Sequence, residues 1–494
     1  MIMKRKTKAA AVCMAAAALT MGAAFTSMAA WEQDNGIWIY TDNSGNRVTD
    51  SWRQSGNSYF YLDSNGEMAV ERWVDDTYYV DANGARVSSQ WVYVEEGTDG
   101  APNSEGGWFY LDANGRVVTE GWRTINNQRY HFDSDGTMQY GWLNDEENLY
   151  YLGDENDGAA KTGWLNLEYD ENEGQEDGTV TEQSTSGTWF YFQDNGRAVK
   201  ASGEDSYVNR TINGSRYYFD ENGAMLTGWA AVGERQAGDM TGISTLKYFG
   251  DSNSGQMARG WLYLYDDPED SDNGGDRDFS FGTASPSDAT PSSADYEGGE
   301  GAWYYFSNSG VPAYLDANAS TLTEATTRIN GSRYFFDEYG RMQSGLIGLS
   351  QADGTTVSAY FGADDSDGRM KNARQTNVME EDGERSAFYF TSTGGYTGVR
   401  NGYLYNQGKQ VQAEEGEDLQ VFEVGSQLYL VNESGRIQNS NRAYRADGEY
   451  RYEYDNGTIY NINNDRERLS TVTSGERLPG IAYESVYRLN GSAQ

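Results

Sequence analysis

The chain has 494 residues but only one cysteine, one histidine and six prolines, and its 37 lysines and arginines face 76 acidic residues. A single cysteine excludes an internal disulfide, and one cysteine with one histidine cannot build a zinc site. The formal charge of −39 repels nucleic acid and anionic membranes, so we expect neither as a partner. The chain is instead rich in glycine (59) and in aromatic residues (38 Tyr, 17 Phe and 13 Trp), which argues against disorder.

The first residues differ in chemistry from the rest. Four basic residues lie between Lys4 and Lys8, an alanine-rich apolar run follows from Ala9 to Phe25, and small residues precede Ala29. This pattern is typical of a secretory signal peptide cleaved after Ala29. Cleavage would remove four basic residues and no acid, leaving 33 − 76 = −43. No later run is apolar enough to span a bilayer, so we expect a secreted protein.

A short unit recurs along the chain. Residues 130–142, 217–229 and 334–346 each contain an aromatic cluster, Asp, two residues, Gly, one residue and Met, and the first two copies end in Gly-Trp. The same frame begins at Tyr59, Trp108, Tyr150, Trp189, Tyr248, Trp303, Tyr360 and Phe388. The copies follow one another in groups of three, which indicates duplication of a three-unit block.

Each unit predicts a β-hairpin. We expect an aromatic first strand, a tip such as Asp112 to Gly115, and a second strand that runs through Met to Gly-Trp. A lone hairpin of this size is marginally stable, so the hairpins must bury their rings against their neighbours. The predicted fold is therefore all-β, an elongated β-solenoid of stacked hairpins that follows the signal peptide.

The composition divides the chain further. Residues 266–302 are acidic and rich in Pro, Ser and Gly, as expected of a surface loop, and the repeat pattern weakens after about residue 400. The predicted organisation is a signal peptide (1–29), hairpin repeats (30–265), the acidic loop (266–302), further repeats (303–402), and degenerate repeats with a C-terminal cap (403–494).

The Gly-Trp, aromatic doublet and Asp-x-x-Gly-x-Met pattern resembles the cell-wall-binding repeat family, known from choline-binding proteins of Gram-positive bacteria. The resemblance implies a solenoid with ligand pockets between neighbouring hairpins, lined by the Gly-Trp tryptophan and the next aromatic doublet. The predicted pocket walls are Trp122 with Tyr130, Trp142 with Tyr150, Trp229 with Tyr248, Trp52 with Tyr59 and Tyr61, and Trp73 with Tyr79. The candidate ligand-binding residues are Trp52, Tyr59, Tyr61, Trp73, Tyr79, Trp122, Tyr130, Trp142, Tyr150, Trp164, Trp229, Tyr248, Trp261 and Trp303.

Two ligands fit such pockets. A quaternary ammonium such as choline is attracted to aromatic faces by about 0.5–2 kcal/mol per face, and a glycan can stack its rings on Tyr and Trp. The resemblance therefore implies attachment to the bacterial cell wall, through choline-decorated teichoic acid or through peptidoglycan or another glycan. The alternative is a structural or adhesive surface protein whose repeats act as a spacer and whose loops contact another cell.

No catalytic, metal or cofactor site is expected. The acidic segments Asp154–Gly158 and Asp364–Gly368 lack the spacing of a calcium loop. His131 stands where sister units carry Tyr218 and Phe335, which indicates a strand residue and not a general base. Hairpin units take up the chain, and no stretch of 100 residues remains for a catalytic domain. We therefore expect a non-catalytic protein without cofactor.

Overall fold

The computed structural model describes residues 30–145, 147–167, 187–251, 254–264 and 301–489. The predicted signal peptide and residues 266–300 of the predicted acidic loop lie outside this described part. The chain divides into two compact units, residues 1–206 with 221–224, and residues 207–220 with 225–494. This division falls inside the predicted repeat block 30–265.

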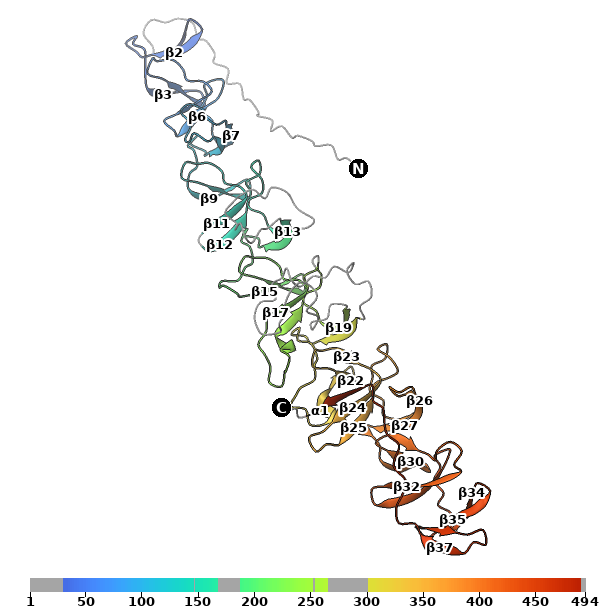
Figure 1. Ribbon diagram of the computed structural model, residues 1–494. Helices are drawn as coiled ribbons and strands as arrows, with labels where there is room; N and C mark the ends of the chain where they lie inside the picture. Colours follow the sequence, from blue (N-terminus) through green and yellow to red (C-terminus); the bar gives the residue numbers. More distant parts are fainter. Residues whose placement is uncertain (1–29, 146, 168–186, 252–253, 265–300, 490–494) are drawn as a thin grey trace, which may run out of the picture. The chain divides into compact units, whose positions relative to one another are not determined.

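The first unit is a succession of two-stranded antiparallel hairpins (Figure 1). The first strand of each hairpin pairs with the strand that follows it in sequence. The hairpins are β1 (Ala30–Asp34) with β2 (Ile37–Thr41), β3 (Ser51–Ser55) with β4 (Ser58–Leu62), β5 (Arg72–Val74) with β6 (Tyr78–Val80), β7 (Gln90–Val94) with β8 (Gly107–Leu111), β9 (Gly121–Ile125) with β10 (Gln128–Phe132), β11 (Trp142–Asp145) with β12 (Asn148–Tyr151), and β13 (Gly163–Leu167) with β14 (Thr188–Phe192).

The second unit begins with hairpins of the same kind and ends in larger sheets. Its hairpins are β15 (Val208–Ile212) with β16 (Ser215–Phe219), β17 (Trp229–Ala231) with β18 (Leu246–Tyr248), β19 (Gly260–Leu264) with β20 (Ala302–Phe306), β21 (Thr326–Ile329) with β22 (Ser332–Phe336) and β23 (Met342–Gln343), and β24 (Leu346–Ser350) with β25 (Thr356–Tyr360). The sheets that follow contain β26 (Arg374–Met379), β27 (Arg385–Thr391), β28 (Gly394–Gly395), β29 (Gly398–Arg400), β30 (Tyr403–Asn406), β31 (Lys409–Val411), β32 (Leu419–Val424), β33 (Gln427–Asn432), β34 (Arg442–Ala446), β35 (Glu449–Asp455), β36 (Thr458–Ile462) and β37 (Arg468–Thr471).

The all-β prediction is confirmed. Within the described residues the only helical segments are α1 (Leu322–Ala325) and the 3₁₀ turn η1 (Ile243–Thr245). None of the helices in that part of the chain has the length and apolar character needed to cross a membrane.

The predicted pairing of strands within a unit is found between β22 and β23, where Phe336 lies opposite Met342, but it is wrong for the units that end in Gly-Trp. The Gly-Trp strand does not close a hairpin with the aromatic strand before it; it pairs with the aromatic strand after it, as β9 does with β10. The tip between them is the two-residue turn Asn126-Asn127, in which both residues have positive φ (49° and 68°). Such turns match the right-handed twist of a hairpin. The Asp-x-x-Gly turn, such as Asp112 to Gly115, also reverses the chain. The residues on its two sides form only an isolated bridge, between Leu111 and Val117, and not a ladder.

The Asp-x-x-Gly turn instead joins one hairpin to the previous one. Asp112 Oδ1 accepts hydrogen bonds from the amides of Asn114 (2.7 Å) and Arg116 (2.8 Å), which fixes the turn. The next amide, that of Val117, donates to the carbonyl oxygen of Thr77 in the preceding hairpin (2.9 Å). The signature Asp therefore shapes a turn whose exit connects neighbouring hairpins by a backbone hydrogen bond.

The signature methionines are core residues, as the sequence favours. Met138 and Met225 are each 5% exposed. A Cβ on Gly158, in the turn of the following hairpin, would come within 2.3 Å of the Met138 sulfur. The unit thus needs both residues, because the thioether fills the space that the glycine leaves.

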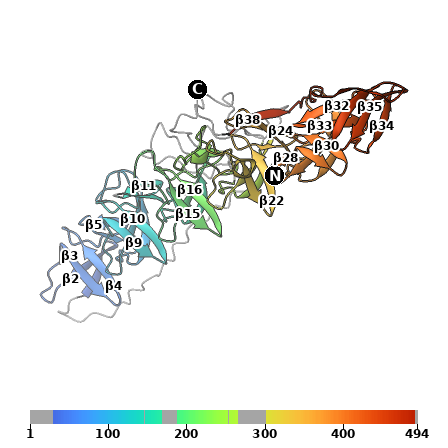
Figure 2. The same ribbon diagram turned by 90° about the horizontal axis from the view of Figure 1, so that it is seen from below.

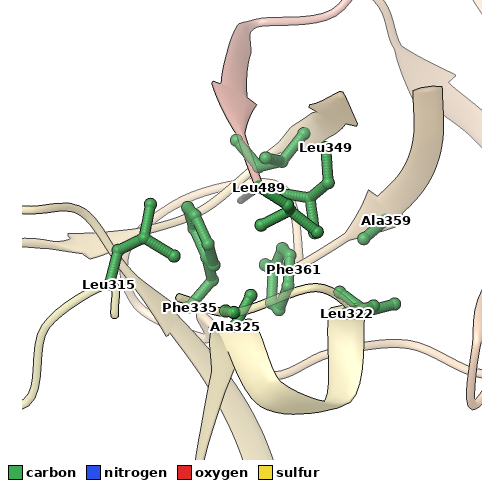
Figure 3. Packing of buried hydrophobic residues seen from close by; sticks show 10 residues of the cluster. Leu315, Leu322, Ala325, Phe335, Leu349, Ala359, Phe361 and Leu489 are labelled. Carbon is green, nitrogen blue, oxygen red and sulfur yellow. The ribbon is translucent and has the colours of Figure 1, made fainter. Parts of the chain in front are cut away.

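The last described strand, β38 (Ser485–Arg488), returns to the middle of the second unit. It pairs in parallel with β24, and Figure 2 shows the two strands side by side. Leu489, 3% exposed, completes a buried cluster with residues of β22, β24 and β25, as Figure 3 shows. The cluster consists of Leu315, Ala319, Leu322, Ala325, Phe335, Ile347, Leu349, Ala359, Phe361 and Leu489.

Candidate functional site

The tryptophans Trp122, Trp142, Trp229 and Trp261 of the Gly-Trp strands each pack between two rings, one across their own hairpin and one from the next hairpin. The ring centroid of Trp122 lies 5.0 Å from that of His131, its partner in the β9–β10 ladder, and 4.5 Å from that of Tyr150 on β12. The rings meet at 75° and 52°, close to the edge-to-face geometry that aromatic pairs prefer. We call each such group of three rings a cage and name it by its tryptophan.

The structure revises two predicted ring pairs. Tyr130 was expected beside Trp122, but it lies 4.9 Å from Trp91. Tyr150 was expected beside Trp142, but it lies against Trp122. The reason is the alternation of side chains in a strand: adjacent residues point to opposite faces, so one ring of each doublet serves its own hairpin and the other serves the previous one. Other predicted pairs do contact, namely Trp52 with Tyr61 (5.2 Å), Trp73 with Tyr79 (5.5 Å) and Trp229 with Tyr248 (5.3 Å).

Three of the candidate tryptophans are buried. Trp73, Trp142 and Trp229 are 4%, 9% and 2% exposed. Their partners from the next hairpin are themselves completely buried, namely Phe109, Phe190 and Tyr304. The faces of these three tryptophans are therefore covered by protein.

Two other cages hold a cation that belongs to the chain itself. In the Trp52 cage, the Cζ atom of Arg86 lies 4.3 Å from the ring centroid of Tyr59, 5.6 Å from that of Trp52 and 5.5 Å from that of Tyr78. In the Trp122 cage, the Cζ atom of Arg129 lies 4.2 Å from the tryptophan ring. These distances are typical of cation–π contacts.

An acid completes the Trp122 cage. The indole Nε1 of Trp122 donates a hydrogen bond to Asp145 Oδ2 at 2.8 Å, which fixes the ring on which Arg129 rests. The hydroxyl of Tyr150 accepts a hydrogen bond from Arg197 Nε at 3.1 Å. In this cage the cation over the rings is Arg129 of the chain itself, and the polar atoms of Trp122 and Tyr150 are hydrogen-bonded.

The Trp91 and Trp261 cages have the same geometry but no such arginine. Trp91 lies 5.1 Å from Tyr110 and 4.9 Å from Tyr130, and its ring planes meet theirs at 61° and 62°. In the Trp261 cage the distances to Tyr305 and Tyr334 are 5.2 and 4.8 Å, with angles of 64° and 65°. Both tryptophans are partly exposed. Among the described residues no guanidinium or ammonium lies over the rings of either cage.

A methionine packs beside each of these two cages. Met138 belongs to the buried cluster against which Trp91 and Tyr110 pack, and Met342 belongs to the one that contacts Trp261 and Tyr305. Each cage therefore combines three rings and a thioether, and offers a partly exposed indole to a ligand.

The sequence prediction missed four of the residues in these cages, namely Trp91, Tyr110, Tyr305 and Tyr334. Trp91 follows Gln90 where the signature has Gly, which weakened its match. Its position in the repeat could have identified it. Trp91 and Trp261 both occur in the hairpin before a unit with the sequence Asn-x-x-Arg-aromatic, which is Asn126–Tyr130 for Trp91 and Asn330–Tyr334 for Trp261. Of the other candidates, Trp164 contacts Tyr191 (5.0 Å) and Trp303 contacts Trp261 (6.3 Å).

An acid influences the Trp91 cage. Burial, and secondarily the carboxylate of Asp157, raise the pKa of Tyr130, whose hydroxyl donates to Gln128 Oε1 at 3.0 Å. Asp157 also forms an ion pair with Lys161. Tyr130 is neutral at physiological pH, as an ordinary tyrosine is, and a nearby negative charge favours a cationic ligand over an anionic one.

Family models of two kinds match this chain. A choline-binding repeat matches residues 118–164 and 209–260, a second choline-binding repeat model matches residues 46–86, and a cell wall binding repeat matches residues 30–46, 183–198 and 298–311. Comparison with curated protein sequences gives no significant match. The matched residues, which make up less than half of the chain, are therefore repeats of the choline-binding and cell wall binding kind, and this confirms the resemblance found in the sequence.

Solved structures with detectable similarity include several from Streptococcus pneumoniae. They include the modular autolysin LytC (18% identity over 65% of this chain and 55% of that one, TM-score 0.35) and CbpJ (20% identity, 78% of this chain and 100% of that one, TM-score 0.32). A third is CbpF in complex with ipratropium (17% identity, 78% and 99% coverage, TM-score 0.33). The chain thus spans about half the length of the autolysin.

Proposed function

We propose that this chain is a secreted, non-catalytic surface protein that attaches to the bacterial cell wall, and that its Trp91 and Trp261 cages capture quaternary ammonium groups such as choline. The observation that carries the proposal is the pair of sister cages in which Arg86 and Arg129 rest on the rings. A cage that accepts a guanidinium in one hairpin is suited to an external cation where that arginine is missing.

Several weak sites suffice for attachment. One cage of this kind binds with about millimolar affinity, since two or three cation–π faces contribute about 0.5–2 kcal/mol each. A wall polymer that carries many choline groups engages several cages at once, which multiplies the affinity without any new contact.

The test uses the secreted chain and the substitutions Trp91→Leu and Trp261→Leu. Leucine is a replacement that the chain itself tolerates, since Leu346 takes the place of the signature tryptophan and is buried in a cluster. The double variant is expected to lose its retention on immobilised choline by at least tenfold. Trp122→Leu is the matched control, because Arg129 already covers that ring, and it should be retained like the parent chain.

Competitors separate the two candidate ligands. Free choline should elute the protein, whereas 3,3-dimethylbutanol, which has the same shape without the charge, should not. Elution by the neutral alcohol, or full retention of the double variant, would contradict cation capture. Elution from isolated walls by soluble peptidoglycan fragments but not by choline would assign the cages to a glycan.

A further inference from the structure

The hairpins β15–β18 repeat the pattern of β9–β12, but at the place of the Trp122 cage they carry basic residues and not rings. By ladder register, Asn209 stands where the first block has Trp122, and Lys247 stands where it has Tyr150. The arginine is kept, as Arg216 in place of Arg129. Arg216 therefore has lost the two rings on which its counterpart rests.

These basic groups have no acidic partner in the described part of the chain. Lys247 is only 7% exposed, yet no hydrogen bond or ion pair involves its ammonium group there. The Nε atom of Arg216 is buried without a hydrogen-bond partner. Burial, and secondarily the charge of Arg216, lower the pKa of Lys247. The buried Lys247 and the partly buried Arg216 lie close together, and such a pair of cations is costly unless a negative group compensates it.

A cavity opens next to this pair. Its volume is about 420 Å³, and its polar lining includes Arg216, Arg259, Ser254 and Gln256. Met257 also lines the cavity. The side chains of Met257 and Lys247 both lie next to Gly310. Gln256 Oε1 already accepts a hydrogen bond from the Ser215 hydroxyl (3.3 Å), so its amide NH₂ remains available as a donor.

We propose that this cavity binds a phosphate group, either free or as an ester. Arg216 and Arg259 provide guanidinium groups, which match phosphate oxygens in planar pairs. Ser254 and Gln256 add neutral donors, and Lys247 adds charge from the side of Met257. None of the described residues that line the cavity is acidic, although the chain has 76 acidic residues. The volume also accommodates the organic part of a phosphate ester.

The test titrates the secreted chain with inorganic phosphate at low ionic strength, followed by calorimetry. Saturable binding is expected, and Arg216→Gln or Arg259→Gln should weaken it at least tenfold. Arg210→Gln is the matched control, because it removes the same charge from an exposed position on the same hairpin, and it should change the affinity less than twofold. Arg259 is also exposed, so its substitution leaves the core intact.

Titrations with other compounds identify the source of the phosphate group and test the specificity of the cavity for phosphate. A glycerol phosphate monoester and a short glycerol phosphodiester oligomer distinguish a small phosphate ligand from a phosphodiester polymer, and acetate tests for a general preference for anions. Absence of saturable phosphate binding, or an equal loss in Arg210→Gln, would overturn the proposal. Trp91→Leu/Trp261→Leu should bind phosphate normally, so the outcome is independent of the choline proposal.

Discussion

Tryptophans in the same local sequence take different roles in this chain. Gly121-Trp122 and Gly141-Trp142 each begin a strand, but Trp142 is 9% exposed and Trp122 lies under an arginine. Both its own hairpin and the following one decide the difference. Phe190 and Phe192 of the following hairpin cover Trp142, whereas Trp122 meets Tyr150 of the following hairpin and Arg129 of its own. The role of a tryptophan therefore depends in part on residues of another hairpin, which its own sequence context does not contain.

Replacement of the buried Trp142 should cost much more stability than replacement of the partly buried Trp122. Trp142→Ala is expected to lower the free energy of unfolding by about 3–5 kcal/mol, because it leaves a cavity among Tyr151, Phe190 and Phe192. Trp122→Ala should cost less than half of that. Urea unfolding followed by circular dichroism measures the loss in free energy of unfolding for both variants. Equal losses would show that the difference in burial does not affect stability.

Removal of an internal cation should create a new ligand site. In Arg129→Gln the faces of Trp122 and Tyr150 lose the guanidinium that covers them. If cages of this kind capture quaternary ammonium, the variant binds one more choline per chain than the parent in equilibrium dialysis. Arg123→Gln serves as the control, since its guanidinium bonds to backbone carbonyls of Trp122 and Thr119 and lies over no ring. An unchanged count in Arg129→Gln would mean that the arginine does not block the cage.

Among the elements, the Asp-x-x-Gly turn is the one that most constrains the sequence. Gly115 has φ = +72°, and a Cβ there would lie 2.8 Å from the carbonyl oxygen of Val87 in the preceding hairpin. Gly115→Ala should therefore destabilise the chain by about 2–4 kcal/mol, from the left-handed backbone and from the forced separation of hairpins. Gly121 also has positive φ (+87°), but a Cβ there meets nothing within 4 Å.

Gly121→Ala is thus the matched control and should cost only about 1–2 kcal/mol, the backbone term alone. Chemical denaturation of the two variants compares them directly. A cost for Gly115→Ala no greater than that for Gly121→Ala would contradict the close approach of the two hairpins.

At the same scale, the sequence revealed the repeat and the β-structure but gave the wrong strand pairs. Each unit contains two turn signals, Asp-x-x-Gly and a second one such as Asn213-Gly214, and local chemistry alone does not rank them. Which of the two turns closes a hairpin depends on backbone hydrogen bonds to the preceding hairpin, such as that from the Val117 amide to the Thr77 carbonyl oxygen. The ring pairs of the cages depend on this register, so the prediction named the tryptophans but exchanged some of their partners.

At the scale of a whole compact unit, the last described residues run back over the second unit. The amide of Ala482 donates to Glu380 Oε2 (3.0 Å), and Lys409 Nζ donates to the carbonyl oxygen of Gly480 (3.0 Å). Glu380 and Lys409 are themselves buried and ion-paired at 2.8 Å. Residues 476–489 therefore supply partners to a buried charged pair and complete a hydrophobic cluster, so they stabilise elements that lie 71 residues or more before them in the sequence.

A chain that ends after Ser474 should show how much the second unit depends on this segment. The truncation removes Leu489 from its cluster and the backbone partners of Glu380 and Lys409, so we expect a loss of at least about 3 kcal/mol in the second unit. Hydrogen exchange followed by mass spectrometry should show faster exchange in β24 and β25 but unchanged exchange in β9 and β10, which belong to the first unit. A chain that ends after Leu489 is the control and should match the parent. Unchanged protection of β24 in the shorter chain would mean that the parallel pairing with β38 contributes nothing to the stability of this unit.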